Sequence, residues 1–145
     1  MAHQDATRST TILIVEDNEL NMKLWNDVLE AQGYSLLKTP FGIEALEIAR
    51  KHRPDLILLD IRLPDISGFD VARRLKGHEA TQSIPVIALT AFAQAEHQRE
   101  ALVSGCDGYI SKPVNVVNFL QTVQSWLGVI VPAKSALPPQ RDGSR

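Results

Sequence analysis

Five short apolar runs recur along the chain, and each is followed by polar residues. Because the runs are four to six residues long and rich in branched aliphatic side chains, they predict strands. The runs at 11–15, 55–60 and 84–89 are apolar almost throughout, which predicts strands buried on both faces. The run at 34–39 mixes polar and apolar residues, which predicts a strand at a sheet edge. The fifth predicted strand spans residues 108–111.

Longer segments with helical spacing of apolar residues separate these runs. Asn18 is a suitable N-cap for the first of them, and Gly33 suits the left-handed position after its end. The predicted helices are residues 19–32, 42–52, 69–76, 94–104 and 114–127. The buried face of the first is predicted to carry Leu20, Leu24, Val28 and Ala31, with Trp25 and Leu29 beside it.

Strict alternation of strand and helix predicts a parallel sheet with helices on both faces. Right-handed crossovers then favour an α/β, doubly wound, five-stranded sheet. A closed barrel needs eight such units, and the chain is too short for it. Residues 1–10 and 129–145 are polar or rich in proline, so we expect a flexible arm and a flexible tail around one domain at 11–128.

Composition excludes several classes of function. The 145 residues carry a net charge of −2, so no basic field indicates nucleic acid. The one cysteine, Cys106, cannot form an internal disulfide and is interpreted as a small buried side chain. No apolar run is long enough to span a membrane, and no signal sequence is evident, so a cytoplasmic protein without membrane insertion is expected.

Side chains that can bind ligands or react lie where the predicted strands end. Glu16 and Asp17 follow the first strand, Asp60 ends the third, and Thr90 and Lys112 follow the fourth and fifth. These ends share one edge of a parallel sheet, where ligands bind in such folds. Considered one at a time, these residues have simpler explanations, as acids at a helix terminus, a turn residue or a solvated charge. Together, the oxygen ligands indicate Mg²⁺, with Mn²⁺ as a substitute, and an aspartate that accepts a phosphoryl group.

These residues resemble the receiver domain of two-component response regulators over residues 11–128. The matching features are Glu16-Asp17, Asp60 with Pro64 and Gly68 behind it, Thr90-Ala91, and Tyr109 three residues before Lys112-Pro113. The resemblance implies the flavodoxin-like strand order 2-1-3-4-5. A closer likeness, to single-domain regulators of cell division, is carried by four segments: Val15–Leu24, Leu29–Tyr34, Thr90–Ala93 and Tyr109–Pro113.

The resemblance also implies a role for each site residue. Asp60 would accept phosphate from a phosphohistidine, while Thr90 and Lys112 would bind the phosphoryl oxygens. Asp17, Asp60 and the backbone carbonyl of Arg62 would bind Mg²⁺, with Glu16 acting through water. Thr90 and Tyr109 would form a switch pair. The peptide bond before Pro113 would be cis, and Arg62 and Phe92 would flank the site.

The implied function is a phosphorylation-switched signalling protein rather than an enzyme, with at most slow self-catalysed phosphorylation and dephosphorylation. Its implied partners are a sensor histidine kinase or phosphatase and a downstream kinase or other output protein, in cell-division or cell-cycle control. Three alternatives stay open: a chemotaxis-type regulator, a phosphorelay intermediate, and a phosphatase that works through an aspartyl phosphate. The phosphatase would need a second acid and a cap, and the sequence indicates neither.

Overall fold

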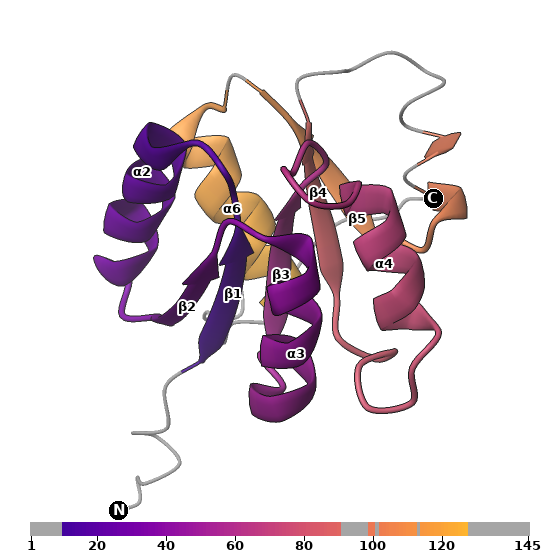
Figure 1. Cartoon of the computed structure of the whole chain (residues 1–145). Helices are drawn as coiled ribbons and strands as arrows, with labels where there is room; N and C mark the ends of the chain where they lie inside the picture. The colour runs from indigo at the N-terminus through magenta and orange to yellow at the C-terminus, as the bar shows by residue number, and fades with distance from the viewer. Residues whose placement is uncertain (1–9, 91–98, 101, 113, 128–145) are drawn as a thin grey trace, which may run out of the picture. The chain divides into compact units, whose positions relative to one another are not determined.

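The computed structural model describes residues 10–90, 99–100, 102–112 and 114–127 (Figure 1). Within these ranges the strands are β1 (Thr11–Val15), β2 (Ser35–Thr39), β3 (Leu56–Asp60), β4 (Val86–Thr90) and β5 (Gly108–Ser111). The helices are α2 (Glu19–Glu30), α3 (Gly42–His52), α4 (Gly68–Lys76) and α6 (Val116–Leu127). The predicted helix at 94–104 lies mostly outside the described residues, although residues 99, 100, 102 and 103 are helical.

All five strands are parallel, and their order is β2-β1-β3-β4-β5. The predicted fold class and strand order are therefore confirmed. From β1 the chain goes to β2 at one edge of the sheet. It then crosses back past β1 to β3 and continues in that direction to β4. Right-handed crossovers consequently place α2 on one face of the sheet and both α3 and α4 on the other. Figure 1 shows α3 and α4 side by side in front of the sheet.

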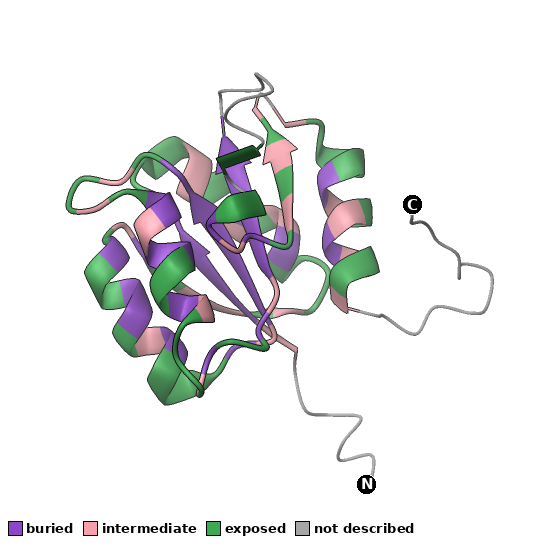
Figure 2. Cartoon of the chain, turned by 90° about the vertical axis from the view of Figure 1, so that its right-hand side faces the viewer, coloured by how far each residue is buried: buried purple, intermediate pink, exposed green. Residues whose placement is uncertain are grey.

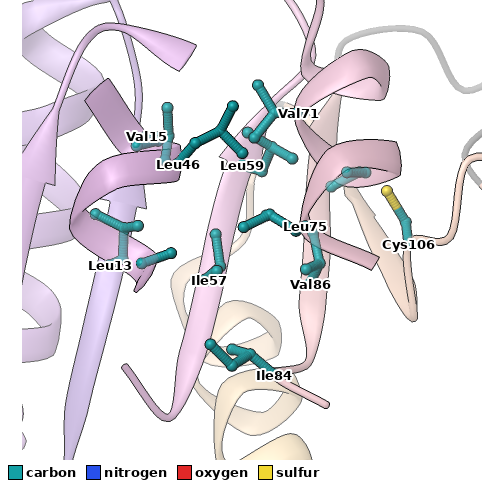
Figure 3. Close-up of a cluster of buried hydrophobic side chains, with 14 of the residues drawn as sticks. Leu13, Val15, Leu46, Ile57, Leu59, Val71, Leu75, Ile84, Val86 and Cys106 are labelled. Carbon is teal, nitrogen blue, oxygen red and sulfur yellow. The ribbon is translucent and has the colours of Figure 1, made fainter. Parts of the chain in front are cut away.

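The core on the α3 and α4 face is built from alternate strand residues (Figure 3). Because side chains alternate between the two faces of a sheet, every second position of β1, β3 and β4 points into this cluster. Its strand members are Leu13, Val15, Ile57, Leu59, Val86 and Ala88. Cys106 packs in the same cluster and is buried, as predicted. The intervening strand residues are also buried, so β1, β3 and β4 are covered on both faces (Figure 2).

The predicted buried face of α2 is wrong in part. Trp25 and Leu29 are buried, whereas Leu20 is 79% exposed and Leu24 is 41% exposed. Apolar residues occupy two adjacent stripes of this helix, so their spacing cannot decide which stripe faces the sheet. In the structure, the stripe that contains Trp25 and Leu29 is the buried one. The predicted N-cap is confirmed, because the Asn18 side chain accepts a hydrogen bond from the Asn21 N–H.

The described residues up to 112 form one compact unit, and those from Val114 onward form another. In the second unit, the Asn115 side chain accepts a hydrogen bond of 3.0 Å from the Asn118 N–H. This cap explains why α6 begins at Val116 rather than at the predicted Val114. No helix in the described ranges has the length and apolar character needed to cross a bilayer.

Candidate functional site

Backbone hydrogen bonds place the ends of the strands at one edge of the sheet. The N–H of Ile61, just after β3, donates to the Leu89 carbonyl at 3.2 Å. The N–H of Lys112, just after β5, donates to the Thr90 carbonyl at 2.7 Å. The register also pairs Asp60 with Leu89, so Thr90 follows the residue beside Asp60. The main chain therefore brings the predicted acid, hydroxyl and ammonium groups to a common edge.

Three side chains meet at this edge. The Lys112 Nζ lies 3.2 Å from Oε1 of Glu16 and 3.3 Å from Oδ2 of Asp60. The Glu16 side chain is fully buried and the Asp60 side chain is 9% exposed, while that of Lys112 is 18% exposed. One ammonium thus bridges two buried carboxylates that are 44 residues apart in sequence, with a positive charge to offset their repulsion.

Two further donors hold the Glu16 carboxylate. The Asn18 N–H donates to Oε2 at 3.1 Å, and the Trp25 indole N–H donates to Oε1 at 3.4 Å. Together with Lys112, these groups satisfy both oxygens of a buried charge. Glu16 is therefore fixed from β1, from the start of α2 and from the end of β5.

The Asp60 carboxyl is strongly perturbed. Its pKa is raised from 3.8 to about 6, chiefly by burial and in addition by the hydrogen bond and negative charge of Glu16. Lys112 and the Arg62 N–H, which donates to Oδ1 at 3.2 Å, act in the opposite direction. A carboxylate held next to a second one in a buried site has a strong electrostatic preference for an added cation.

The loop after Asp60 is held by close backbone packing. The Gly68 N–H donates to the Ile61 carbonyl at 2.8 Å. A Cβ atom at Gly68 would lie 2.4 Å from the Asp60 carbonyl oxygen and 2.7 Å from the Ile61 Cα. Backbone atoms cannot move aside as a flexible side chain does, so only glycine permits this approach. The packing fixes where β3 ends and α4 begins.

The same loop caps a neighbouring helix. Asp65 accepts hydrogen bonds from the N–H groups of Gly42 and Ile43 at 2.8 and 2.9 Å. The residue before α3, Phe41, supplies no side-chain cap, so the carboxylate of Asp65 takes that place. Slight burial raises the pKa of Asp65, but the backbone N–H donors outweigh it and the net shift is downward.

The other predicted site residues differ in how far they are exposed. Asp17 is exposed and lines a groove with Glu16. Thr90 is buried, and Tyr109 is 37% exposed. Phe92 and Pro113 lie outside the described residues, and so does the predicted cis peptide bond. Among the described residues, no group of three or more Asp, Glu, His or Cys side chains is close enough to hold a metal by itself.

The groove beside the site has a volume of about 700 Å³. It lies between residues of α2 and the segment that joins β2 to α3. Its lining includes the acidic residues Glu16, Asp17 and Glu19 and the apolar residues Met22 and Phe41.

The family model for the response regulator receiver domain matches residues 12–124. The chain belongs to the response regulator receiver domain family. It is 52% identical over 118 residues to the polar-differentiation response regulator DivK of Brucella anthropi, which covers 81% of this chain and 96% of that protein. DivK of Brucella suis has the same identity and coverage.

Two solved structures extend the comparison. The receiver domain of the sensor histidine kinase PA1611 from Pseudomonas aeruginosa has a magnesium ion coordinated in its active-site cleft. It is 33% identical, with a TM-score of 0.78, and covers 83% of this chain and 99% of its own. The chemotaxis protein CheY4 of Vibrio cholerae is 27% identical, with a TM-score of 0.77, and covers 81% of this chain and 98% of its own. Magnesium binding thus occurs in the family.

The residues of this receiver domain fit a magnesium ion by their chemistry. Glu16 and Asp60 supply hard oxygen donors within reach of a single ammonium, so two carboxylates share one positive charge. Asp17 is adjacent in sequence and exposed on the side of the groove. Oxygen-only donors at a solvent-accessible edge are typical of Mg²⁺, which retains several water ligands.

Sequence reasoning missed two residues that shape the receiver site. Apolar spacing places Trp25 on a helix but does not connect its indole N–H with Glu16. Asp65 lies in the loop after β3 and caps a helix that begins 22 residues earlier in the chain. For Asp65, one usable signal existed: α3 begins with Phe41-Gly42, which offers no capping side chain.

Proposed function

We propose that this receiver domain accepts a phosphoryl group on Asp60 from a phosphohistidine of a sensor histidine kinase. Phosphorylation then changes its affinity for other proteins. The observation that carries the proposal is the bridge from Lys112 to Glu16 and Asp60 at the ends of three strands. It combines a nucleophilic carboxylate, a cation for the incoming phosphoryl oxygens and a second carboxylate that favours a metal ion.

In the transfer step, an Oδ atom of Asp60 forms a bond to phosphorus as the P–N bond of phosphohistidine breaks. The electron pair of that bond returns to the imidazole nitrogen, and Asp60 becomes an acyl phosphate. Asp60 must be ionised to attack, and Lys112 favours that form. Lys112 then turns toward the phosphoryl oxygens, and the Thr90 hydroxyl donates a hydrogen bond to another of them.

The proposed metal ligands are Asp17, Asp60 and the backbone carbonyl of Arg62, with Glu16 acting through water. When bound, Mg²⁺ neutralises negative charge on the phosphoryl oxygens and the carboxylates, and Mn²⁺ can replace it. Apart from supplying these ligands, the chain orients Asp60 through the Arg62 N–H and the close packing of Gly68. The Arg62 and Phe92 side chains are proposed to flank the site and to control access of water.

The proposed switch pair is Thr90 and Tyr109. A hydroxyl that moves toward the phosphoryl group leaves space behind it, and the half-exposed ring of Tyr109 is placed to respond. A bistable element of this kind converts a small charged group into a change of surface. Any partner that prefers one position of the ring also favours one phosphorylation state.

The identity to DivK supports a role in cell-division or cell-cycle control. The proposed partners are a sensor histidine kinase or phosphatase on the donor side and a downstream kinase or other output protein, all meeting this domain in the cytoplasm. The apolar and acidic groove beside Asp17 is the proposed approach for the donor. Nucleic acid is not proposed as a partner, and turnover is limited to slow self-catalysed steps.

The test is transfer from a purified, phosphorylated histidine kinase domain to the full chain in Mg²⁺. We expect one phosphoryl group per wild-type chain and none on Asp60→Asn. Equal labelling of the two proteins would contradict the proposal. Return of the phosphoryl group to a histidine phosphotransfer protein would favour a phosphorelay intermediate. Sustained turnover of small phosphate monoesters would favour a phosphatase.

A further inference from the structure

One tryptophan of α2 reaches the acidic site directly. Trp25 is 2% exposed, and its indole Nε1 lies 3.4 Å from Oε1 of Glu16. The distance is at the long end of the hydrogen-bonding range, but the acceptor is a buried carboxylate, which strengthens such a contact. Leu29, one turn later on the same helix, is equally buried and has no polar atom. Trp25 therefore has a chemical contact that packing of α2 does not require.

We propose that Trp25 is a positioning residue for the cation site, because it holds the Glu16 carboxylate in the orientation that serves Mg²⁺. The inference rests on the proposed function, in which Glu16 contributes to that site. Trp25 itself touches neither the metal nor the phosphoryl group. It acts through Glu16, as outer groups around metal ligands commonly do.

The argument follows from what the three donors to Glu16 do during phosphorylation. Lys112 and Trp25 both donate to Oε1, while the Asn18 N–H donates to Oε2. In the proposed reaction Lys112 turns toward the phosphoryl oxygens, so its bond to Glu16 weakens. The hydrogen bond from Trp25 to Glu16 does not depend on Lys112 and stays in place. Its indole is rigid and uncharged, so it fixes the carboxylate without competing with a cation for charge.

Loss of this donor removes one of the hydrogen bonds to Oε1 and keeps the one from Lys112. The Glu16 carboxylate can then follow the lysine or rotate against Asp60, whose pKa its charge already raises. Either change makes the carboxylate a poorer partner for a hydrated cation. Phenylalanine at position 25 keeps an aromatic ring in the core and removes only the donor. Leu29→Val removes one methylene from the same buried face and leaves Glu16 untouched, which makes it the matched packing control.

The first measurement is isothermal titration calorimetry of the full chain with Mg²⁺ alone. Relative to wild type, we expect the dissociation constant to rise roughly tenfold in Trp25→Phe. In Leu29→Val it should stay within about twofold. In a Glu16→Gln background, Trp25→Phe should have little further effect, because the two residues act as one unit. Wild-type Mg²⁺ affinity in Trp25→Phe would overturn the inference and leave the proposed function standing. Failure of the wild-type chain to bind Mg²⁺ would overturn both.

A second measurement does not require that Trp25→Phe fold. The chain has two tryptophans, so Trp126→Phe assigns the two indole N–H signals in a ¹⁵N-correlated NMR spectrum. We expect the Trp25 signal to shift on addition of Mg²⁺ and on Glu16→Gln, and the Trp126 signal to stay in place. A Trp25 indole signal that responds to neither change would show that the ring only fills space, and the inference would be wrong.

Discussion

Thr90 and Tyr109 have their side chains on the same face of the sheet. The register pairs Thr90 with Ser111 and Ala88 with Tyr109, and alternate residues of a strand share a face. Thr90 is buried at the end of β4. Tyr109 lies two residues before Ser111, the partner of Thr90 in β5, and is 37% exposed. The two side chains are diagonal neighbours, which is the arrangement that a coupled movement of hydroxyl and ring requires.

This relationship predicts that Thr90→Ala allows phosphorylation of Asp60 but weakens the change that follows at the ring of Tyr109. In wild type, beryllofluoride, which mimics the phosphoryl group, should change the ring signals of Tyr109 in NMR spectra of protein with ¹³C-labelled tyrosine. In Thr90→Ala, Asp60 should still be phosphorylated, but the change at Tyr109 should fall by at least half. Tyr34, the other tyrosine, is the internal control. An undiminished response in Thr90→Ala would mean that the coupling runs by another route.

The raised pKa of Asp60 predicts that Asp60→Asn stabilises the metal-free protein at neutral pH. The folded protein holds the Asp60 proton up to about pH 6, whereas the unfolded chain releases it near 3.8. The wild-type fold therefore loses stability as the pH rises through this window, and above it the full penalty of roughly 1–3 kcal/mol remains. Asparagine removes the ionised group, so its advantage should be largest at pH 7 and should vanish near pH 4.

Thermal unfolding in EDTA at several pH values measures this difference. Asp27→Asn is the control, because Asp27 pairs with Lys23 on the surface of α2 and its pKa is lowered rather than raised. It should give no stabilisation at pH 7. A melting temperature of Asp60→Asn below that of wild type at pH 7 would contradict the electrostatic account of the site.

Asp17→Asn should weaken Mg²⁺ binding about tenfold or more and slow phosphorylation by the same factor at low Mg²⁺. The exposed Asp17 side chain makes no packing contribution comparable to that of Glu16, so the melting temperature without metal should hold or rise. Calorimetric titration with Mg²⁺ checks the affinity. Full labelling of wild type in excess EDTA would show that the reaction needs no metal, and the ligand assignment would then be wrong.

Gly68→Ala should lower the free energy of unfolding by roughly 1–3 kcal/mol, because the added Cβ meets the backbone at Asp60 and Ile61. It should also slow phosphorylation, since the end of β3 must shift. Gly77→Ala is a milder comparison, as its Cβ approaches no heavy atom closer than 3.2 Å. Urea unfolding measures the free energy of unfolding of both variants. Equal stability of Gly68→Ala and Gly77→Ala would contradict the close packing at Gly68.

Much of this fold could be predicted from sequence because its signals are local. The uninterrupted apolar run Leu56–Leu59 marks a strand buried on both faces, and the acid directly after it marks the edge where ligands bind. Alternation with helices then brings Thr90 and Lys112 to the same edge. The convergence of Glu16, Asp60 and Lys112 follows from topology alone, so it was predictable without any contact information.

The missed features depend on packing choices that local patterns do not contain. The orientation of α2 depends on whether Trp25 or Leu24 faces the sheet, and both stripes are apolar. The indole contact with Glu16 exists only after that choice. The capping of α3 by Asp65 joins the loop after β3 to the start of α3, 22 residues earlier in the chain. Such contacts require three-dimensional positions.

The central claim is that Asp60 carries the phosphoryl group, and borohydride trapping tests it most directly. Borohydride reduces an aspartyl phosphate to homoserine, so mass spectrometry of a proteolytic digest then locates the modified residue. After phosphorylation by the histidine kinase domain in Mg²⁺, we predict homoserine at position 60 and unmodified Asp17, Asp55 and Asp65. Homoserine at any of these other positions, or a phosphorylated chain with Asp60 intact, would contradict the account.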